Sequence, residues 1–214
     1  MLRIETFTFN PFQENTYVVY SGTEAIIIDP GCYEPHERKE LDEFIAAEKL
    51  TPVLLVNTHG HIDHVLGNDH VKSRYRIPLA IHSADVPVLK AVKSYAGNYG
   101  FAAYQEAEPD RLLAEGETIS FGDTSCTILF LPGHAPGHIG LYFGAAGKLL
   151  SGDVLFRESI GRTDLPGGDH ATLIRSITEK VFALPDAVEV FPGHGPTTTI
   201  GYEKIHNPFC GEGA

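Results

Sequence analysis

The heptapeptide THGHIDH, residues 58–64, constrains this chain more than any other stretch of its sequence. Directly after the apolar run at 53–56, it places three imidazoles and a carboxylate within six residues. These belong to His59, His61, Asp63 and His64. A strand that ends in such a cluster delivers several metal-ligand side chains to one point at a sheet edge. Packed without a cation, the same groups would carry an uncompensated cost of burial. The heptapeptide therefore predicts a metal site.

Three isolated residues further along the chain repeat one design, a short apolar run followed by glycine and a candidate ligand. They are His134 in LPGH, Asp153 in LLSGD and His194 in FPGHG. Seven candidates exceed what one tetrahedral ion uses, but they suit two ions if one carboxylate bridges them. We expect the first ion to be held by His59, His61 and His134, the second by Asp63, His64 and His194, and both by Asp153 and a bridging hydroxide.

Length and charge limit the classes of protein to consider. The 214 residues suit a single domain, 1–214. A formal charge of -12 argues against nucleic acid as a partner, because phosphate binding needs clustered Lys and Arg. No apolar run reaches the length of a membrane span, and the N-terminal residues do not resemble a signal peptide. We expect a cytoplasmic protein that binds neither nucleic acid nor membrane.

The order of the expected elements is strands, helix, strand, helices, then strands, helix and strand. Such an order favours two packed sheets with helices outside. We expect strands at 2–9, 17–20, 25–28, 53–57, 79–81, 118–121, 126–131, 139–143, 149–151 and 188–191, helices at 38–50, 65–74, 84–93 and 171–183, and a long loop or irregular helix at 94–111. Aromatic residues of that loop either pack on the core or line a substrate groove.

Four motifs, in this order, carry a resemblance to a known family: THGHIDH, LPGHAPGH, SGDVLF and FPGHG. Together they resemble the signature motifs of the metallo-β-lactamase superfamily over nearly the whole chain. The resemblance implies an α/β fold, the αββα metallo-β-lactamase sandwich of two mixed β-sheets flanked by helices. True β-lactamases usually carry a cysteine ligand where Asp153 stands, so an antibiotic hydrolase is not expected.

Two further segments are similar to the glyoxalase II group, the hydroxyacylglutathione hydrolases, in their short single-domain bacterial type. These are FRESIGRTDLPGGD at 156–169 and PGHGPTTTIGYEKIHNP at 192–208. The resemblance implies a metal-dependent hydrolase that cleaves a small-molecule thioester such as S-lactoylglutathione to a hydroxy acid and glutathione. A metal-bridging hydroxide would attack, with Asp63 and Asp153 as catalytic residues. Two divalent ions are expected, with zinc preferred and iron or manganese as alternatives.

Departures from the long glyoxalase II enzymes leave other readings open. We expect no C-terminal helical glutathione-binding domain within 1–214. Arg162 and Asp164 stand at substrate-binding positions of the long enzymes, or they pair with each other. The run at 161–164 also resembles persulfide dioxygenases, which use mononuclear iron on the same fold. Another metallo-hydrolase of thioesters or lactones, or a metal-binding protein without catalysis, remains an alternative.

Overall fold

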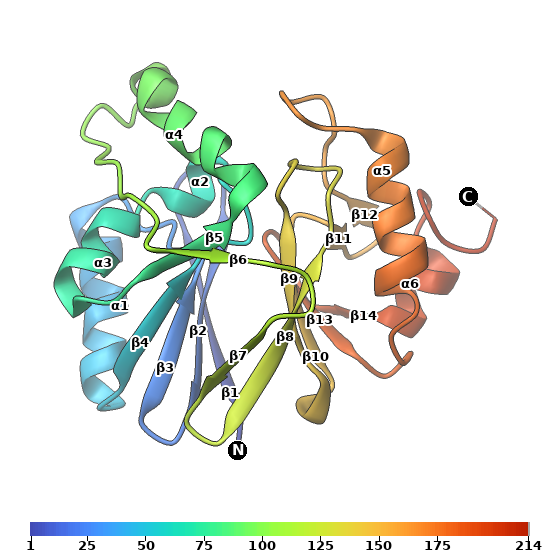
Figure 1. The fold of residues 1–214 in the computed structure, drawn as a ribbon, viewed down its shortest axis with the longest axis horizontal. Coiled ribbons are helices and arrows are strands. Elements are labelled where there is room, and N and C mark those ends of the chain that lie inside the picture. The colour runs from blue at the N-terminus through green and yellow to red at the C-terminus, as the bar shows by residue number, and fades with distance from the viewer. Residues whose placement is uncertain (214) are drawn as a thin grey trace. The chain divides into compact units, whose positions relative to one another are not determined.

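The computed structural model describes residues 1–213, and the chain divides into two compact units. Unit 1 comprises Met1–Leu113 and Ser120–Ser125, and unit 2 comprises Ala114–Ile119 and the chain from Cys126 onward. Two six-stranded sheets are present, the first built from β1 to β6 and the second from β7 to β10, β13 and β14 (Figure 1). The single domain expected for 1–214 stays a prediction.

The sheet of unit 1 is mixed, with the strands in sequence order. Its strands are β1 (Arg3–Phe9), β2 (Glu14–Ser21), β3 (Glu24–Ile28), β4 (Thr51–Val56), β5 (Leu79–His82) and β6 (Arg111–Leu113). β1, β2 and β3 pair antiparallel, whereas β3 to β6 pair parallel. Because parallel strands end at the same edge of a sheet, the residues that follow β3, β4 and β5 are gathered at that edge.

Helix α1 (Pro35–Ala47) lies along one side of this sheet, together with α3 (Figure 1). It begins three residues before the expected start at residue 38, because Pro35 occupies the first turn and Glu34 and Glu37 form a capping box. Leu41 and Ile45 of α1 are buried in the core of the unit. This core fixes the position of the strands whose ends carry the candidate ligands.

The helix expected at 65–74 is wrong in one respect, because two helices occupy this stretch. They are α2 (Ile62–Val65) and α3 (Asn68–Tyr75). Gly67 N donates to Pro30 O at 2.7 Å, and the Asp63 carbonyl that a continuous helix would use accepts from Asn10 Nδ2 at 3.0 Å. The α4 helix (Val86–Tyr95) follows a short 3-10 turn, η1 (Ser83–Asp85), and precedes another, η2 (Ala96–Tyr99).

The sheet of unit 2 has the order β14-β13-β10-β9-β8-β7. Its strands are β7 (Thr118–Phe121), β8 (Thr124–Phe130), β9 (Ile139–Phe143), β10 (Lys148–Gly152), β13 (Glu189–Pro192) and β14 (Thr198–Thr199). β8, β9 and β10 pair antiparallel and β10 and β13 pair parallel. The ends of β8, β10 and β13 and the start of β9 therefore meet at one edge.

Helices on one side of the second sheet complete unit 2 (Figure 1). They are α5 (His170–Arg175), the π-helical segment η4 (Ser176–Val181) and α6 (Ile200–His206), with a 3-10 turn η3 (Gly144–Ala146) elsewhere. A separate hairpin pairs β11 (Leu155–Phe156) with β12 (Ser159–Ile160). The sequence did not predict this hairpin, β6 or β14, since strands of two or three residues show no usable period. It also did not predict α6, a helix of seven residues.

Two general findings bear on function. No helix within the described residues is long and apolar enough to cross a membrane. The three cysteines, Cys32, Cys126 and Cys210, are buried free thiols. The cytoplasmic location expected from the sequence stays a prediction.

Candidate metal centre

The four candidate ligands of unit 1 follow β4 at the edge where the parallel strands end. His59, His61 and His64 are buried, and the side chain of Asp63 is 15% exposed. The His59 ring lies 4.7 Å from the His61 ring and 4.2 Å from the His64 ring, between centroids. Unit 1 therefore brings together the histidines that the sequence predicts as ligands.

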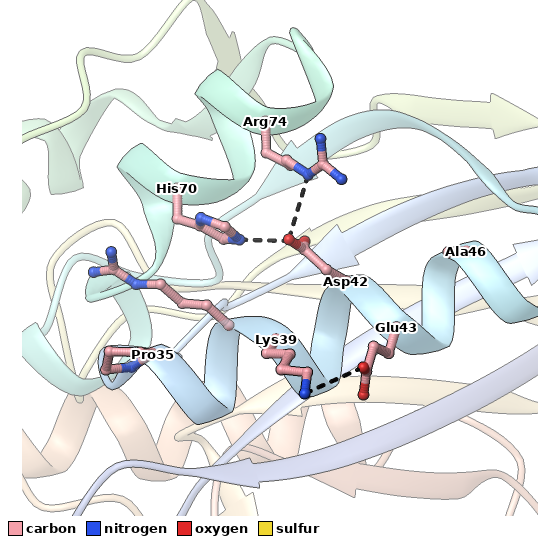
Figure 2. A pocket seen from close by; sticks show the side chains of 8 residues that line it. Pro35, Lys39, Asp42, Glu43, Ala46, His70 and Arg74 are labelled. Atoms are coloured by element: carbon pink, nitrogen blue, oxygen red, sulfur yellow. Dashed lines mark hydrogen bonds and ion pairs between the residues drawn. The ribbon is translucent and has the colours of Figure 1, made fainter.

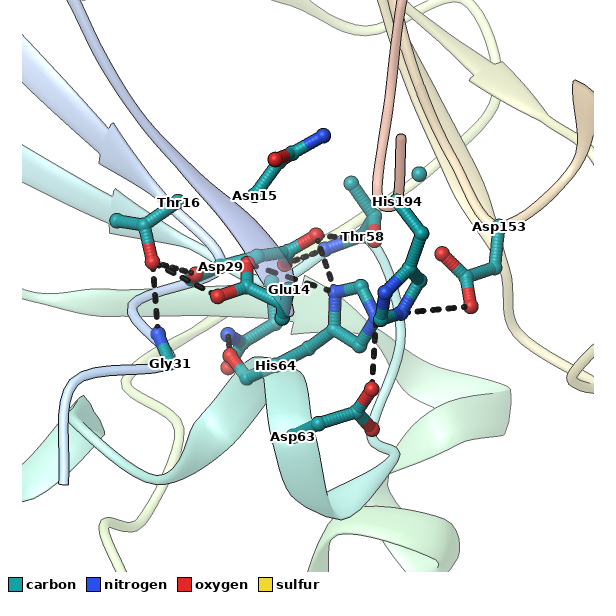
Figure 3. Close-up of polar contacts among 12 residues, drawn as sticks. Glu14, Asn15, Thr16, Asp29, Gly31, Thr58, Asp63, His64, Asp153 and His194 are labelled. Carbon is teal, nitrogen blue, oxygen red and sulfur yellow. Dashed lines mark hydrogen bonds and ion pairs between the residues drawn. The ribbon is translucent and has the colours of Figure 1, made fainter. Parts of the chain in front are cut away.

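Asp29 orients part of this cluster from the end of β3 (Figure 3). Its carboxylate accepts from Thr58 N at 2.7 Å and from Thr58 Oγ1 at 2.6 Å, and its Oδ2 lies 3.1 Å from His64 Nδ1. Asp29 adopts φ 49°, the left-handed region, which Asp tolerates better than most residues. The contact with His64 is that of a hydrogen-bond partner of a candidate ligand.

Thr58, itself bound to Asp29, orients His59. Its hydroxyl hydrogen is used toward Asp29, so its oxygen is left to accept from His59 Nδ1, 3.0 Å away. Both His59 and His64 therefore place Nδ1–H on an acceptor of the protein and keep the lone pair of Nε2 for another group. Ligand atoms of Asp29, His59 and His64 all lie within 4.8 Å of one another.

A second buried carboxylate, Glu14 on β2, lies behind His64. Glu14 is fully buried, its Oε2 accepts from Thr16 Oγ1 at 2.9 Å, and its Oε1 lies 3.9 Å from His64 Nδ1. Burial raises the pKa of Glu14 well above 4.5, although the nearby His64 opposes this effect. Glu14 is thus a buried acid directly behind a candidate ligand.

The loop that carries the histidines is also held through its backbone. Asp85 is fully buried, and its carboxylate accepts from Gly60 N at 2.5 Å, between His59 and His61. Asn10 Nδ2 donates to the carbonyl of Asp63 at 3.0 Å. These contacts fix the direction of successive ligand side chains.

Unit 2 places its three candidate ligands around one carboxylate oxygen. Asp153 Oδ2 lies 3.6 Å from His134 Nε2 and 3.6 Å from His194 Nε2. His134 and Asp153 are buried, and the His194 side chain is 26% exposed. Figure 3 shows Asp153 and His194 directed toward each other. One oxygen facing two imidazoles is the arrangement expected of a bridging carboxylate.

Neighbouring groups set the orientation of these ligands as well. His134 Nδ1 lies 2.7 Å from the carbonyl oxygen of Arg162, so it donates there and directs Nε2 toward Asp153. His138 Nε2 accepts from Asp153 N at 3.0 Å, and its ring lies 5.9 Å from that of His134. His138 therefore supports Asp153 from the backbone side.

The candidate ligands offer imidazole nitrogens and carboxylate oxygens, which are donors that divalent metal ions accept. Metal-ligating histidines characteristically donate their second ring N–H to a carboxylate, carbonyl or similar acceptor, as His59, His64 and His134 do. Two donors of one tetrahedral ion, each about 2.0–2.1 Å from it, lie about 3.3 Å apart. The spacings of 3.6 Å around Asp153 are close to that separation and too long for hydrogen bonds.

Arg162 and Asp164, predicted to bind substrate, form a bidentate ion pair with each other. Arg162 Nε and Nη2 donate to the two oxygens of Asp164 at 2.7 Å each, and the side chains are 61% and 68% exposed. These hydrogen bonds hold the pKa of Asp164 at about 2. Substrate binding by the two residues stays a prediction.

A groove elsewhere in unit 1 lies between α1 and α3 and is separate from every predicted ligand (Figure 2). Asp42 accepts from Tyr75 Oη at 2.6 Å and also contacts His70 and Arg74, at 3.2 and 3.3 Å. These interactions tie Asp42 of α1 to three residues of α3. The groove therefore belongs to the packing of the two helices and not to the candidate metal centre.

Several supporting residues were missed in the sequence, namely Thr58, Glu14 and Asp85. Thr58 is adjacent to His59, and a hydroxyl next to a ligand was a usable signal. Glu14 lies 50 residues before His64 and Asp85 lies 25 residues after Gly60, so only the folded unit brings these groups together. Such contacts leave no periodic pattern in the sequence.

Comparison with known proteins agrees with this arrangement. The family model described as the metallo-beta-lactamase superfamily matches residues 9–194. The hydroxyacylglutathione hydrolase GloC of Haemophilus influenzae is 36% identical over 211 residues, which cover 97% of this chain and 98% of that protein.

Two solved structures share the fold over almost the whole chain. One, described as TTHA1623 in a di-iron-bound form, is 37% identical with a TM-score of 0.86, covering 96% of this chain and 99% of that one. The other, described as the BLEG-1 B3 metallo-beta-lactamase, is 36% identical with a TM-score of 0.85, covering 97% and 99%. The expected fold class, two mixed sheets with flanking helices, is confirmed.

Proposed function

Because the chain belongs to the metallo-β-lactamase superfamily, we propose that it is a metal-dependent hydrolase of small-molecule thioesters, with S-lactoylglutathione as the representative substrate. Membership supports an enzyme of the metallo-hydrolase type. The choice of a thioester rests on the 36% identity to the hydroxyacylglutathione hydrolase GloC and on the segments at 156–169 and 192–208.

One observation carries the metal-dependent part of this proposal: Asp153 Oδ2 faces the Nε2 atoms of both His134 and His194 at 3.6 Å. We propose two divalent ions, zinc in preference to iron or manganese, because nitrogen and oxygen ligands accept all three. The seven ligands are those expected from the sequence: His59, His61, Asp63, His64, His134, Asp153 and His194.

The side chains of this chain would each have a defined task. Divalent ions, when bound, would acidify a water and polarise the thioester carbonyl. Asp153, whose Oδ2 faces His134 and His194, would help to hold the ions, and Asp63 would accept a hydrogen bond from the attacking water. Thr58, Asp29 and the Arg162 carbonyl keep the imidazoles of His59, His64 and His134 in the tautomer that carries its hydrogen on Nδ1. The leaving thiol has an ordinary pKa of about 8.5, so it departs as a thiolate without a strong general acid.

Arg162 and Asp164 are proposed to contribute to substrate binding from the exposed end of the site. The guanidinium already satisfies the Asp164 carboxylate. An anionic group of the substrate would therefore compete with Asp164 for Arg162. In the Arg162→Gln variant we expect a higher KM for S-lactoylglutathione with kcat nearly unchanged.

The first test is the hydrolysis of S-lactoylglutathione by purified protein reconstituted with zinc, followed as loss of the thioester absorbance. We expect kcat/KM above about 10⁴ M⁻¹s⁻¹, an ordinary value for an enzyme. The matched control is Asp153→Asn, which keeps the size of the side chain and removes its charge. A wild-type rate no higher than that of the control would refute the thioester assignment.

β-Lactam hydrolysis is a second candidate, because the solved structure described as a B3 metallo-beta-lactamase is 36% identical across 97% of this chain. A chromogenic cephalosporin assayed beside the thioester separates the two activities. The Asp153→Asn variant is the control in both assays. Turnover of the cephalosporin alone would replace the thioester proposal. Oxygen consumption with glutathione persulfide tests the dioxygenase reading, which no observation favours.

A further inference from the structure

The β11–β12 hairpin and the two residues that follow it lie against every candidate ligand of unit 2. Arg162, two residues after β12, presents its carbonyl to His134 Nδ1 at 2.7 Å. The Phe156 ring on β11 lies 6.1 Å from the His194 ring. A Cβ atom on Gly161 would lie 1.9 Å from the carbonyl oxygen of Asp153, so only glycine lets the backbone pass so close.

This hairpin has little stability of its own. Each strand has two residues, and isolated two-stranded hairpins are marginal in water. Glu158 in its turn adopts φ 56°, the left-handed region, which a non-glycine residue occupies only when its surroundings require it. The position of the hairpin must therefore be imposed from elsewhere in the unit.

Glu203 on α6 supplies that constraint. It is fully buried, and its Oε2 accepts from Glu158 N in the hairpin turn at 2.9 Å. Asn207 Nδ2 donates to the same carboxylate at 2.8 Å and to Ser159 O at 3.0 Å. The other oxygen of Glu203 accepts from Thr198 Oγ1 at 2.5 Å. Two side chains of the C-terminal segment thus bind Glu158 of the turn and Ser159 of β12.

We propose that Glu203 is a positioning residue of the metal centre, which orients His134 and His194 by fixing the β11–β12 hairpin against α6. This role rests on the metal-dependent function proposed above. It deepens that function, because it assigns a task to the TIGYEKIHNP segment, none of whose residues is a predicted ligand. Burying the Glu203 carboxylate is costly by itself, and the three donors around it offset that cost.

The test compares Glu203→Met with Glu203→Gln. Glutamine can accept from Glu158 N and Asn207 through its amide oxygen and donate to Thr198 through its amide nitrogen, so it preserves the contacts. Methionine has similar length and accepts none of these bonds. We expect Glu203→Met to bind Co²⁺ at least ten-fold more weakly in competition with a chelator, with altered Co²⁺ visible absorption bands. Glu203→Gln is expected to keep the affinity and the bands of the wild type.

Val181→Ala provides a matched loss of stability in the same unit, because Val181 is buried in its core and lies on η4, outside both the hairpin and α6. The two variants are compared when their metal-free forms have the same melting temperature. Equal Co²⁺ affinity of Glu203→Met and Val181→Ala would then overturn the proposal. Wild-type protein that binds no Co²⁺ would overturn it as well.

Should Glu203→Met fail to fold, Asn207→Ala replaces it, since this variant removes the bond to Ser159 O and leaves Glu203 with Thr198 and Glu158. The same weakening of Co²⁺ binding is then expected, and its absence would count against the proposal. A wild type that binds Co²⁺ but hydrolyses no thioester contradicts the proposed substrate and leaves the comparison of variants valid.

Discussion

At the scale of single residues, the candidate metal centre depends on groups that orient imidazoles more than on the imidazoles alone. Asp29 contacts both Thr58 and His64, and Thr58 in turn contacts His59. One carboxylate therefore determines which nitrogen is left for a metal on two histidines. Replacing Asp29 should therefore disturb the orientation of both His59 and His64.

We expect Asp29→Asn to weaken zinc binding about 10- to 100-fold, the usual effect of losing a hydrogen-bond partner of a ligand. The amide NH₂ would face donors where a carboxylate oxygen now accepts. Competition with a chromogenic chelator measures the affinity. Asp186→Asn is the control, because Asp186 is 72% exposed and pairs with Lys204 at the surface. Equal affinities for the two variants would contradict the role of Asp29.

Glu14 predicts a dependence of stability on pH in the metal-free protein. Burial raises its pKa above 4.5, so the folded state holds a proton that the unfolded state has released as the pH rises. The free energy of unfolding should therefore fall above about pH 5, by on the order of 1 kcal/mol for each unit by which the pKa is raised.

Glu14→Gln removes this titrating group, and the stability of the variant should change less with pH. Chemical denaturation at several pH values between about 5 and 8 gives the difference between the two proteins, in which other titrating groups largely cancel. A difference that does not vary with pH would show that Glu14 titrates normally.

At the scale of elements, strands with a clear apolar run were predicted well, and interruptions set by distant contacts were not. The run at 53–56 preceding THGHIDH identified β4 and the ligands that follow it. The break between α2 and α3 depends on Pro30 and Asn10, which are remote in sequence. Likewise the β11–β12 hairpin is held by Glu203 and has no pattern of its own.

The candidate ligands could be proposed from the sequence because ligand chemistry is local: histidines, aspartates and glycines in short motifs. Their supports were not, since the approach of Glu14 to His64 and the hydrogen bond from Gly60 N to Asp85 arise only once unit 1 is folded. The pairing of Arg162 with Asp164 was foreseen as one of two possibilities, because the residues are two apart.

Gly67 offers a test of the break between α2 and α3. A Cβ atom there would lie 2.5 Å from Cys32 Sγ and 2.8 Å from Pro30 O. We expect Gly67→Ala to lower the free energy of unfolding by about 1–3 kcal/mol, as overpacking does. Gly97→Ala is the control, because a Cβ atom on Gly97 has nothing within 4 Å, and it should change stability by less than about 0.5 kcal/mol. Equal stabilities, measured by urea denaturation, would refute the crowding.

At the scale of the whole molecule, metal binding should be coupled to folding. A ligand present at about 1,000 times its Kd stabilises the folded state by about 4 kcal/mol. For a chain of this size, this corresponds to a rise in Tm of about 10 °C. We expect chelation to lower the Tm of wild-type protein by that amount, as measured by calorimetry.

In Asp153→Asn the same treatment should shift the Tm much less, since the shared oxygen that faces His134 and His194 loses its charge. A shift as large as in the wild type would mean that the stabilising ion is bound elsewhere.

The buried cysteines have a consequence for the chemistry that this chain can tolerate. Burial raises the pKa of Cys32, Cys126 and Cys210 to about 12 each. Since only the thiolate attacks acyl groups and disulfides, roughly one such thiol in 10⁵ is reactive at pH 7. A hydrolase of thioesters works among activated acyl groups and releases a free thiol in every turnover. Its own sulfur atoms would neither be acylated by the substrate nor be captured by the product in a mixed disulfide.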